Sequence, residues 1–392
     1  MKVTKSWGKW PLAVVAAAVL MLGGCGGGGG GGEETVVHAC TLNDFNKTDL
    51  PPEPGVSFFG NNPLYYQQWA IHRDVSFYRE NAIVDDANIH LESEHRYLGR
   101  NVRVAVIDDG LDTTHEDLAN AVVATYDVET GTTDVTPRSD YQNHGTEVTG
   151  VIAARNNGLG IVGVAPGVDI YFIRLPFGQN ISIGQIVDAF EQAKRWDVDV
   201  INCSWGSGDV SDSVAAVIKE LADEGRDGKG TVLVFAAGNS DQEIGNDESG
   251  LPEVIGVGAT DKENLRAYYS NYGPQLDLMA PGGAHIGITT LDQMGNAGLA
   301  TKDPNYIEYD DFKDYGQGVS IPFAGTSASA PIVTGVVAQL LEANPNLTRE
   351  DVYNALVCSA DKIGNVPYDQ DGFNIYYGYG KVNAARALDL VR

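Results

Sequence analysis

Five short apolar runs that alternate with helix-like segments constrain the fold of this chain most strongly. Each run is apolar along nearly its whole length, as expected for a strand of a parallel sheet that is buried on both faces. Helices are expected in the intervening segments, over residues 183–195, 211–224, 326–344 and 349–359 and directly after His144. The alternation predicts an α/β fold, namely a three-layer, doubly wound and mostly parallel sheet. The runs are "VRVAVID", "IYFIRL", "DVINCSW", "TVLVFAAG" and "EVIGVGA".

The N-terminus has the pattern of an export signal. Three lysines precede the apolar run "PLAVVAAAVLML", which is short for a membrane span, and small residues follow it. "LGGC" resembles a bacterial lipobox, so we expect a lipoprotein signal peptide over 1–24 and a lipidated Cys25. A glycine-rich linker would extend over 25–55, followed by one domain over 56–392. The alternative is that Cys25 is an ordinary residue after a plain cleavage site.

A lipid on Cys25 would anchor the chain to a membrane of the bacterial cell envelope. Gly26 does not resemble the aspartate that commonly retains such proteins on an inner membrane, which favours the outer membrane or the cell surface. The chain carries a formal charge of −27. Such a surface repels nucleic acid and suits cationic ligands or metal ions.

Three cysteines remain after Cys25, and an odd number excludes complete pairing. Cys203 and Cys358 lie in apolar surroundings and are expected to be buried thiols. A disulfide that involves Cys40 stays an open alternative, although nothing in the sequence supports it.

Four polar residues lie where a parallel sheet collects its functional groups. Asp108 ends the first apolar run, His144 begins a helix in "NHGTEVTGVIAA", and Asn239 ends a strand in "FAAGNS". Ser327 lies at the start of the helix in "AGTSASAPIVTGVVAQLL", with Pro331 expected in its first turn.

These four residues have the chemistry of nucleophilic acyl transfer. Ser327 would attack a carbonyl carbon, His144 would take its proton, and Asp108 would orient the imidazole. Asn239 and the Ser327 backbone N–H would stabilise the oxyanion. "VAVIDDG" lacks the Gly-x-Gly-x-x-Gly turn of a dinucleotide site, which disfavours that class of protein.

Together with their flanks, "VAVIDDG", "NHGT", "AAGN" and "GTSASAP" resemble the subtilisin-like serine proteases over about residues 61–387. The resemblance implies a serine endopeptidase that acts on proteins or peptides. Two alternatives remain, namely a broad-specificity subtilisin-like protease and a non-catalytic surface lipoprotein that binds peptides.

Within that family, "NNPLYYQQW", "CSWGSGD" and the second aspartate of "DDG" are similar to the kexin and furin branch. This resemblance implies a substrate-binding edge at Ser204, Trp205 and Gly206. Kexin-like enzymes usually carry a folding propeptide, and the roughly 40 residues between Cys25 and the domain are too few for one. A separate folding chaperone is therefore an expected partner.

The branch also implies a preference for Arg or Lys before the scissile bond. Asp209 would lie in the pocket for that residue, with Asp247 as a second acid in preference to Glu248. Asp109 would face the cleft and meet the preceding residue, where selection is expected to be weaker, since Tyr141 replaces an acid. The alternatives are that Asp109 is a turn residue and that these acids are merely solvated.

The stretch "ARNNGLGI" resembles the family's calcium loop. Oxygen ligands of the kind that Ca²⁺ prefers would come from side chains and from the loop's backbone carbonyls. The alternative is a tight Asn-Gly turn that needs no ion. A further segment, "EYDDFKD", is either a surface loop or a border of the cleft. The implied calcium ligands are the side chains of Asp117, Asn157 and, more weakly, Asn62, and the carbonyls of Arg155, Leu159 and Ile161.

Overall fold

The computed structural model describes residues 61–91, 97–177, 181–295, 297–299 and 323–392. All of them belong to one compact unit, His38–Arg392. The expected signal peptide, Cys25, the linker, Cys40 and "EYDDFKD" lie outside the described residues. Within the described residues no helix combines the length and the apolarity needed to cross a bilayer.

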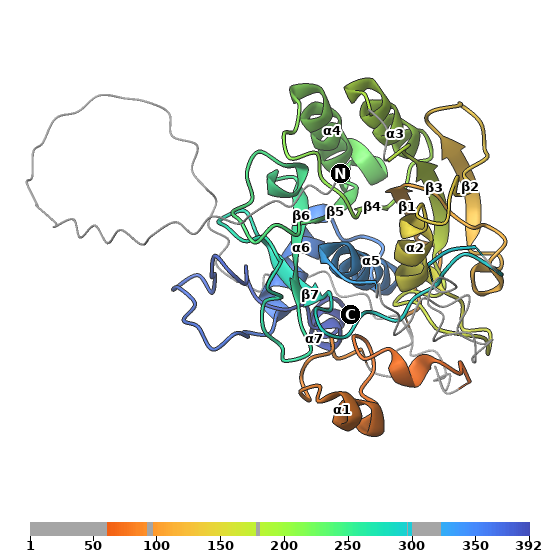
Figure 1. Cartoon of the computed structure of the whole chain (residues 1–392). Coiled ribbons are helices and arrows are strands. Elements are labelled where there is room, and N and C mark those ends of the chain that lie inside the picture. Colours follow the sequence, from red (N-terminus) through yellow and green to blue (C-terminus); the bar gives the residue numbers. More distant parts are fainter. Residues whose placement is uncertain (1–60, 92–96, 178–180, 296, 300–322) are drawn as a thin grey trace, which may run out of the picture. The chain divides into compact units, whose positions relative to one another are not determined.

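The core of the unit is a seven-stranded parallel sheet in the order β2-β3-β1-β4-β5-β6-β7 (Figure 1). This arrangement confirms the predicted α/β fold. The chain moves from β1 to one edge, returns through β3 and then crosses β1 to continue with β4, so the strand order reverses beside β1. Ligands of such sheets bind at the carboxyl ends of the strands where the order reverses. The strands are β1 Arg103–Asp108, β2 Val122–Asp127, β3 Asp169–Arg174, β4 Val200–Cys203, β5 Val232–Ala236, β6 Val254–Thr260 and β7 Leu278–Pro281.

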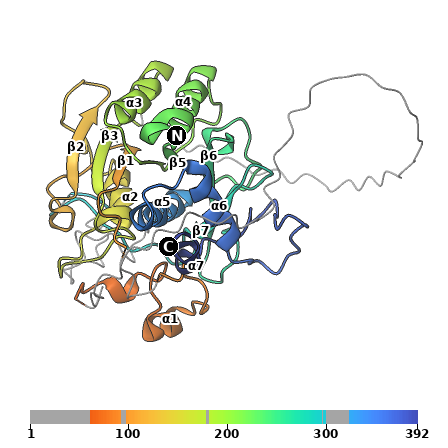
Figure 2. The ribbon, with the colours of Figure 1, turned by 180° about the vertical axis from the view of Figure 1, so that it is seen from behind.

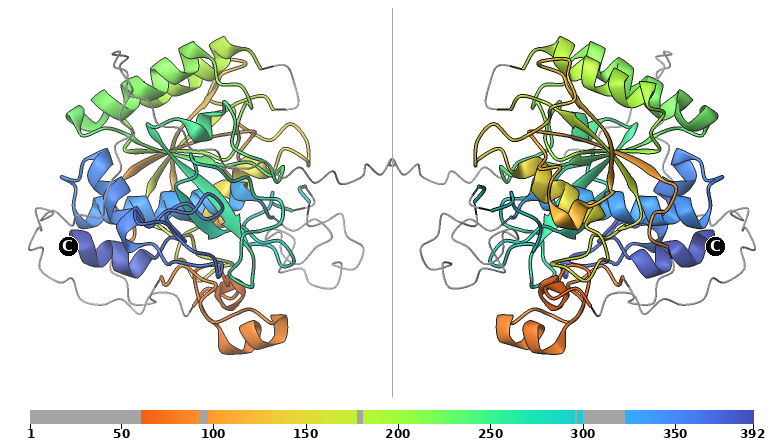
Figure 3. Two further views of the ribbon diagram at one scale, coloured as in Figure 1. Left: turned by 90° about the vertical axis from the view of Figure 1, so that its left-hand side faces the viewer. Right: turned by 90° about the vertical axis from the view of Figure 1, so that its right-hand side faces the viewer.

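Helices cover both faces of the sheet, which makes three layers (Figures 1 and 3). Alternate residues of β1 show why its strand is apolar throughout. Val104 and Val106 belong to the core on the side of α5, whereas Ala105 and Ile107 belong to the core on the side of α3 and α4. In the view from behind, α5 lies at the centre, with α2, α6 and α7 around it (Figure 2). The helices are α1 Val75–Asn81, α2 His144–Ala153, α3 Ile183–Arg195, α4 Asp212–Gly228, α5 Thr326–Ala343, α6 Arg349–Ser359 and α7 Ala384–Val391.

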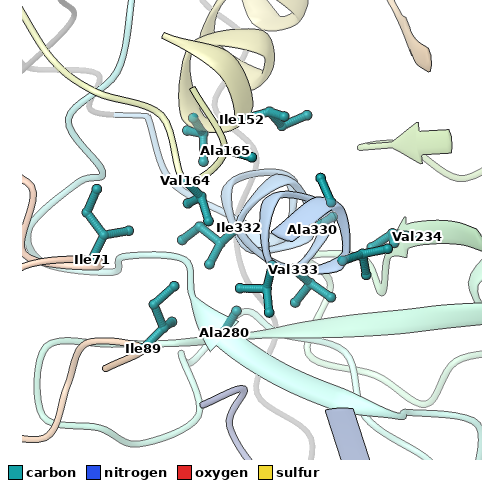
Figure 4. Packing of buried hydrophobic residues seen from close by; sticks show 14 of the residues in the cluster. Ile71, Ile89, Ile152, Val164, Ala165, Val234, Ala280, Ala330, Ile332 and Val333 are labelled. Carbon is teal, nitrogen blue, oxygen red and sulfur yellow. The ribbon is translucent and has the colours of Figure 1, made fainter. Parts of the chain in front are cut away.

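The central helix, α5, is buried along nearly its whole length. Ala330, Ile332 and Val333 pack against neighbouring strands and loops in the larger core (Figure 4). Such a helix has no polar face to place in water, so its position is determined by packing on all sides. Its first turn therefore has a fixed place at the carboxyl ends of the strands.

The helix starts follow from local capping. Ser182 and Gln185 form a capping box at the start of α3, and Thr348 and Asp351 form another at the start of α6. The predicted bounds of both helices are confirmed. Ser211 caps α4, in which regular helical geometry ends before Gly225, close to the predicted end.

Several expectations need correction. The edge strands β2 and β7 were not among the predicted strands, because β2 is half-exposed and β7 is short and ends on Pro281. Pro331 is the sixth residue of α5, not a residue of its first turn, since the helix begins only at Thr326. Cys203 is buried as predicted, whereas Cys358 is only partly buried.

Candidate active site

The carboxyl end of β1 and the first residue of α2 bring Asp108 and His144 together. His144 Nδ1 lies 2.8 Å from Asp108 Oδ1, an oxygen that also accepts the Asp109 N–H at 2.8 Å. Asp108 is almost fully buried, whereas the His144 side chain is 32% exposed. When Nδ1–H donates to this carboxylate, Nε2 is the nitrogen left to accept a proton.

The electrostatics of His144 follow from this contact. Burial lowers the pKa of the ring, but the charge of Asp108 and the hydrogen bond to it outweigh burial and raise the pKa to about 9. The charges of Asp109 and Glu147 act in the same direction. The site therefore favours the imidazolium, the form that a general base reaches after it has taken a proton.

Ser327 is the second residue of α5 and follows a sharp turn at Gly325, whose φ is +127°. Its Oγ donates a hydrogen bond to the carbonyl oxygen of Ser204 at 3.0 Å. In return, Ser204 Oγ donates to the carbonyl oxygen of Ser327, also at 3.0 Å. These reciprocal bonds attach the first turn of α5 to the segment that follows β4. A hydroxyl has one proton, so donation to any other acceptor requires the O–H bond of Ser327 to rotate away from the Ser204 carbonyl.

Asn239 lies beside the same turn. Its Oδ1 accepts the Thr326 N–H at 2.9 Å and the Thr326 hydroxyl at 3.1 Å. Because the oxygen end of the amide is held there, the Nδ2 end is the one that can stabilise a developing oxyanion. Gly238 precedes it at φ +98°, and a Cβ at that position would lie 2.4 Å from Asn271 Nδ2. Only glycine fits at this position.

A cavity of about 360 Å³ opens beside Ser327 and Asn239. Its lining includes Ser204, Trp205 and Gly206, three of the predicted substrate-binding residues. Among the described residues that line it, the charged ones are Glu243 and Asp247, and both are acidic. The cavity therefore suits a positively charged side chain.

Asp247 is held in this wall by hydrogen bonds at both oxygens. Oδ2 accepts the Gly208 N–H at 2.8 Å, and Oδ1 accepts the Ser249 N–H and hydroxyl at 3.0 and 2.8 Å. A Cβ at residue 206 would lie 2.5 Å from Asp247 Oδ2, so Gly206 permits the close approach. Glu248 is the less favoured candidate for the second acid of the pocket. It is fully buried, and its Oε2 accepts the Ser207 N–H at 2.9 Å.

Two predicted substrate-binding acids are placed differently from the expectation. Asp109 is buried, and its Oδ1 accepts the Gly145 N–H at 2.9 Å. It therefore caps the first turn of α2 and does not face open solvent in the cleft. Burial, and then the charge of Asp108, raise its pKa to about 7. Asp209 is exposed, and its Oδ1 accepts Asn246 Nδ2 at 2.8 Å, outside the lining of the cavity.

The predicted calcium ligands meet around the buried side chain of Asn62. Its Nδ2 lies 3.3, 2.6 and 2.6 Å from the carbonyl oxygens of Arg155, Leu159 and Ile161. An amide nitrogen has only two hydrogens for these three acceptors. Within the described part of the chain, Asn62 Oδ1 is buried without a hydrogen-bond partner. Three convergent carbonyls and an amide oxygen fit a hard cation.

The carboxylate of Asp117 is fully buried next to this group, and its Oδ2 accepts the Ile161 N–H at 3.0 Å. Asn157 is placed differently, because its Oδ1 accepts the Leu159 N–H at 2.9 Å and closes the turn. No group of three or more His, Cys, Asp or Glu side chains suited to a metal ion occurs among the described residues. A cation here would therefore depend on carbonyl and amide oxygens together with one carboxylate.

Three residues of the site were missed by sequence reasoning. Glu243 lines the cavity, and Phe323 packs its ring edge-on against His144 with centroids 5.8 Å apart. Glu147 is buried one helical turn after His144, and burial raises its pKa to about 8. Its spacing of three residues from His144 on a helix was the signal that could have found it.

Comparisons with known proteins agree with this geometry. A family model described as "Subtilase family" matches residues 99–380. The calcium-dependent protease of Trichormus variabilis is 33% identical over 318 residues, which cover 74% of this chain but only 46% of that relative. The chain thus spans about half the length of this relative. Subtilisin E of Bacillus subtilis is 28% identical over 358 residues, 89% of this chain and 80% of its own.

The serine protease of Aeromonas sobria has been solved alone and in complex with a chaperone. The structure solved alone is 25% identical to this chain in sequence, with a TM-score of 0.72, and the match covers 85% of this chain and 68% of the matched chain. The match to the structure of the complex has 23% sequence identity and a TM-score of 0.72, and it covers 90% of this chain and 71% of the matched chain.

Proposed function

This chain belongs to the subtilase family, and from that premise we propose that it is a serine endopeptidase that prefers Arg or Lys before the scissile bond. The observation that carries the proposal is the 2.8 Å contact between His144 and Asp108 at the end of β1. The half-buried Ser327 is bonded to Ser204, which follows the neighbouring strand β4. Asn239 and an acidic cavity adjoin the same serine. A nucleophile, a base, an orienting acid and an oxyanion donor therefore share one edge of the sheet.

In the proposed reaction, the O–H bond of Ser327 rotates away from the Ser204 carbonyl, and Oγ attacks the scissile carbonyl carbon. His144 Nε2 takes the hydroxyl proton, and the buried Asp108 stabilises the imidazolium that forms. Asn239 Nδ2 and the Ser327 N–H, at the N-terminus of α5, stabilise the oxyanion. His144 then returns the proton to the leaving amine, and water hydrolyses the acyl-enzyme by the reverse roles.

The proposed preference for a basic residue rests on the cavity beside Ser327. A guanidinium or ammonium group there would meet Asp247, with Glu243 at the rim, in charge-assisted hydrogen bonds. At the preceding position we propose only weak selection, because Asp109 is engaged with the start of α2. Membership of the kexin and furin branch thus stays a proposal, which rests on the cavity and on the resemblance of the sequence motifs to that branch. The alternative is a subtilase with broad specificity.

We also propose that calcium binds at Asn62, Asp117 and the carbonyls of Arg155, Leu159 and Ile161. The convergent oxygen atoms support this proposal, and a relative is named a calcium-dependent protease. The ion would serve structure, since it would join the N-terminal segment to the loop after α2. A separate folding chaperone remains a proposed partner, in view of the chaperone bound to the Aeromonas protease.

The lipid anchor belongs to the proposal on the strength of "LGGC". Cys25→Ser should move the protein from the membrane fraction to the soluble fraction and leave peptidase activity intact. Recovery of the wild-type protein wholly in the soluble fraction would contradict the anchor.

Labelling with a fluorophosphonate probe tests the catalytic proposal. We expect stoichiometric labelling at Ser327, its loss in Ser327→Ala and a strong reduction in His144→Ala, because phosphonylation requires an activated hydroxyl. A folded wild-type protein that stays unlabelled would favour the peptide-binding lipoprotein. Thermal melts of the variants serve as the control for folding.

A further inference from the structure

Pro331 leaves the carbonyl group of Ser327 without its usual helical donor. In an α-helix the N–H of residue 331 would bond to the carbonyl oxygen of residue 327, and proline has no N–H. Ser327 therefore lies in a first turn that α5 itself holds less firmly than an ordinary turn. If the Ser327 carbonyl moves, the nucleophilic hydroxyl on the same residue moves with it. The position of this hydroxyl therefore depends on another group that holds the carbonyl.

That group is the hydroxyl of Ser204, which donates to the carbonyl oxygen of Ser327 at 3.0 Å. Ser204 Oγ in turn accepts a hydrogen bond from Asn202 Nδ2 at 3.0 Å. Because Asn202 occupies the acceptor side of the hydroxyl, the single proton of Ser204 is left to point at Ser327. Ser204 and Asn202 are both buried, so the bond between them is shielded from water.

The far end of this chain of bonds is anchored in the same helix. Asn202 Oδ1 accepts the hydroxyl of Thr334 at 2.8 Å, and Thr334 lies two turns after Ser327 in α5. The hydrogen bonds therefore leave α5 at Thr334, pass through the end of β4 and return to α5 at Ser327. They replace one lost helical hydrogen bond with a connection to the sheet.

We propose that Ser204 and Asn202 are positioning residues that hold the Ser327 carbonyl, and with it the nucleophile, in place of the hydrogen bond that Pro331 removes. This inference rests on the proposed function. It assigns the Ser204 side chain a task in the rate of acylation, separate from any contact of its backbone with substrate. A small displacement of a nucleophile is costly, because the reacting atoms have to be nearly in contact before reaction.

The test combines Ser204→Ala with Pro331→Ala. Ser204→Ala should lower the fluorophosphonate labelling rate and kcat by about tenfold and leave KM within about twofold. The Pro331→Ala substitution restores a backbone N–H that can donate to the Ser327 carbonyl. In the Pro331→Ala background the same Ser204→Ala change should therefore cost less than about threefold.

Ser329→Ala is the matched control. Ser329 lies in the same helix, is fully buried and donates to the Ala280 carbonyl at 3.0 Å, away from Ser327. Its loss should lower the thermal midpoint and leave the labelling rate within about twofold. If Ser204→Ala does not fold, Thr334→Val preserves volume and releases Asn202. It should slow labelling by about threefold, again only when Pro331 is present.

Two results would overturn the inference alone. One is a labelled wild type in which Ser204→Ala changes only the thermal midpoint, as Ser329→Ala does. The other is an equal loss of rate with and without Pro331. An unlabelled, folded wild type would overturn the proposed function and this inference together, so the two failures are distinguishable.

Discussion

At the scale of single residues, we expect the charge of Asp108 to determine the pH range in which His144 acts as the proposed base. Only the neutral imidazole accepts the Ser327 proton, and the pKa of His144 is raised to about 9. We therefore expect kcat/KM to fall as the pH drops below about 9, instead of falling only below the ordinary value of about 6.5. Peptide hydrolysis measured between about pH 5 and about pH 10 checks this expectation.

Glu147→Gln is the control for that profile. It removes one of the charges that raise the pKa of His144 but leaves the Asp108 contact in place. The midpoint should move to lower pH, while the rate at high pH is retained. A wild-type profile that is already level at neutral pH would contradict the raised pKa.

Asp247 should determine which residue is accepted before the scissile bond. Asp247→Asn keeps the shape of the wall and removes the charge that a guanidinium would meet. We expect kcat/KM for an Ala-Arg peptide to fall by about 100-fold, with much less change for an Ala-Leu peptide, because a charge-assisted bond is lost only with the first. The measurement compares kcat/KM for three peptides that carry Arg-Arg, Ala-Arg or Ala-Leu before the same scissile bond.

Asp209→Asn serves as the matched control, because Asp209 is exposed and bonded to Asn246 outside the cavity. It should change kcat/KM by less than about twofold. Equal turnover of the Ala-Leu and Ala-Arg peptides by the wild type would end the basic preference. An equal loss in Asp209→Asn and Asp247→Asn would show that the cavity has been assigned the wrong acid.

At the scale of elements, the sequence predicted those parts whose signals are local. The starts of α3 and α6 follow from capping boxes at Ser182 and Thr348, which depend only on residues three positions apart. The central strands could be recognised because burial on both faces makes them apolar throughout. β2 has no such signal, since it is an edge strand with one half-exposed face.

The candidate site shows where this kind of prediction ends. The sequence placed Asp108 at the end of a strand and His144 at the start of a helix, and the structure brings the two together. It could not show the direction of the Asp109 carboxylate, because this depends on the close approach of α2 to β1. Asp209 is a similar case, since a loop 37 residues away supplies the partner that binds it.

At the scale of the whole domain, three segments distant in sequence meet at the proposed calcium site. Besides Asn62, the N-terminal segment bonds to the loop through Leu64 N–H to the Gly160 carbonyl at 2.8 Å. Gln68 exchanges two hydrogen bonds with the backbone of Val162, at 2.7 and 2.9 Å. Asp117 approaches from the short helix Glu116–Leu118. An ion that binds only the folded chain would therefore stabilise the whole domain.

Calcium at about 1,000 times its Kd should stabilise the fold by about 4 kcal/mol. For a domain of this length each kcal/mol shifts the Tm by about 2 °C, so EDTA should lower the Tm by about 8 °C. Asp117→Asn should abolish most of the EDTA effect. Asn157→Ala should preserve the EDTA effect, because the Asn157 amide oxygen accepts the Leu159 N–H and is not one of the proposed ligands. Asp85→Asn is the neutral control, because Asp85 is an exposed acid that pairs with Arg73.

A Tm unchanged by EDTA and by added calcium would mean that hydrogen bonds alone hold these segments together, as in a plain Asn-Gly turn. An EDTA effect that persists in Asp117→Asn would place the ion elsewhere.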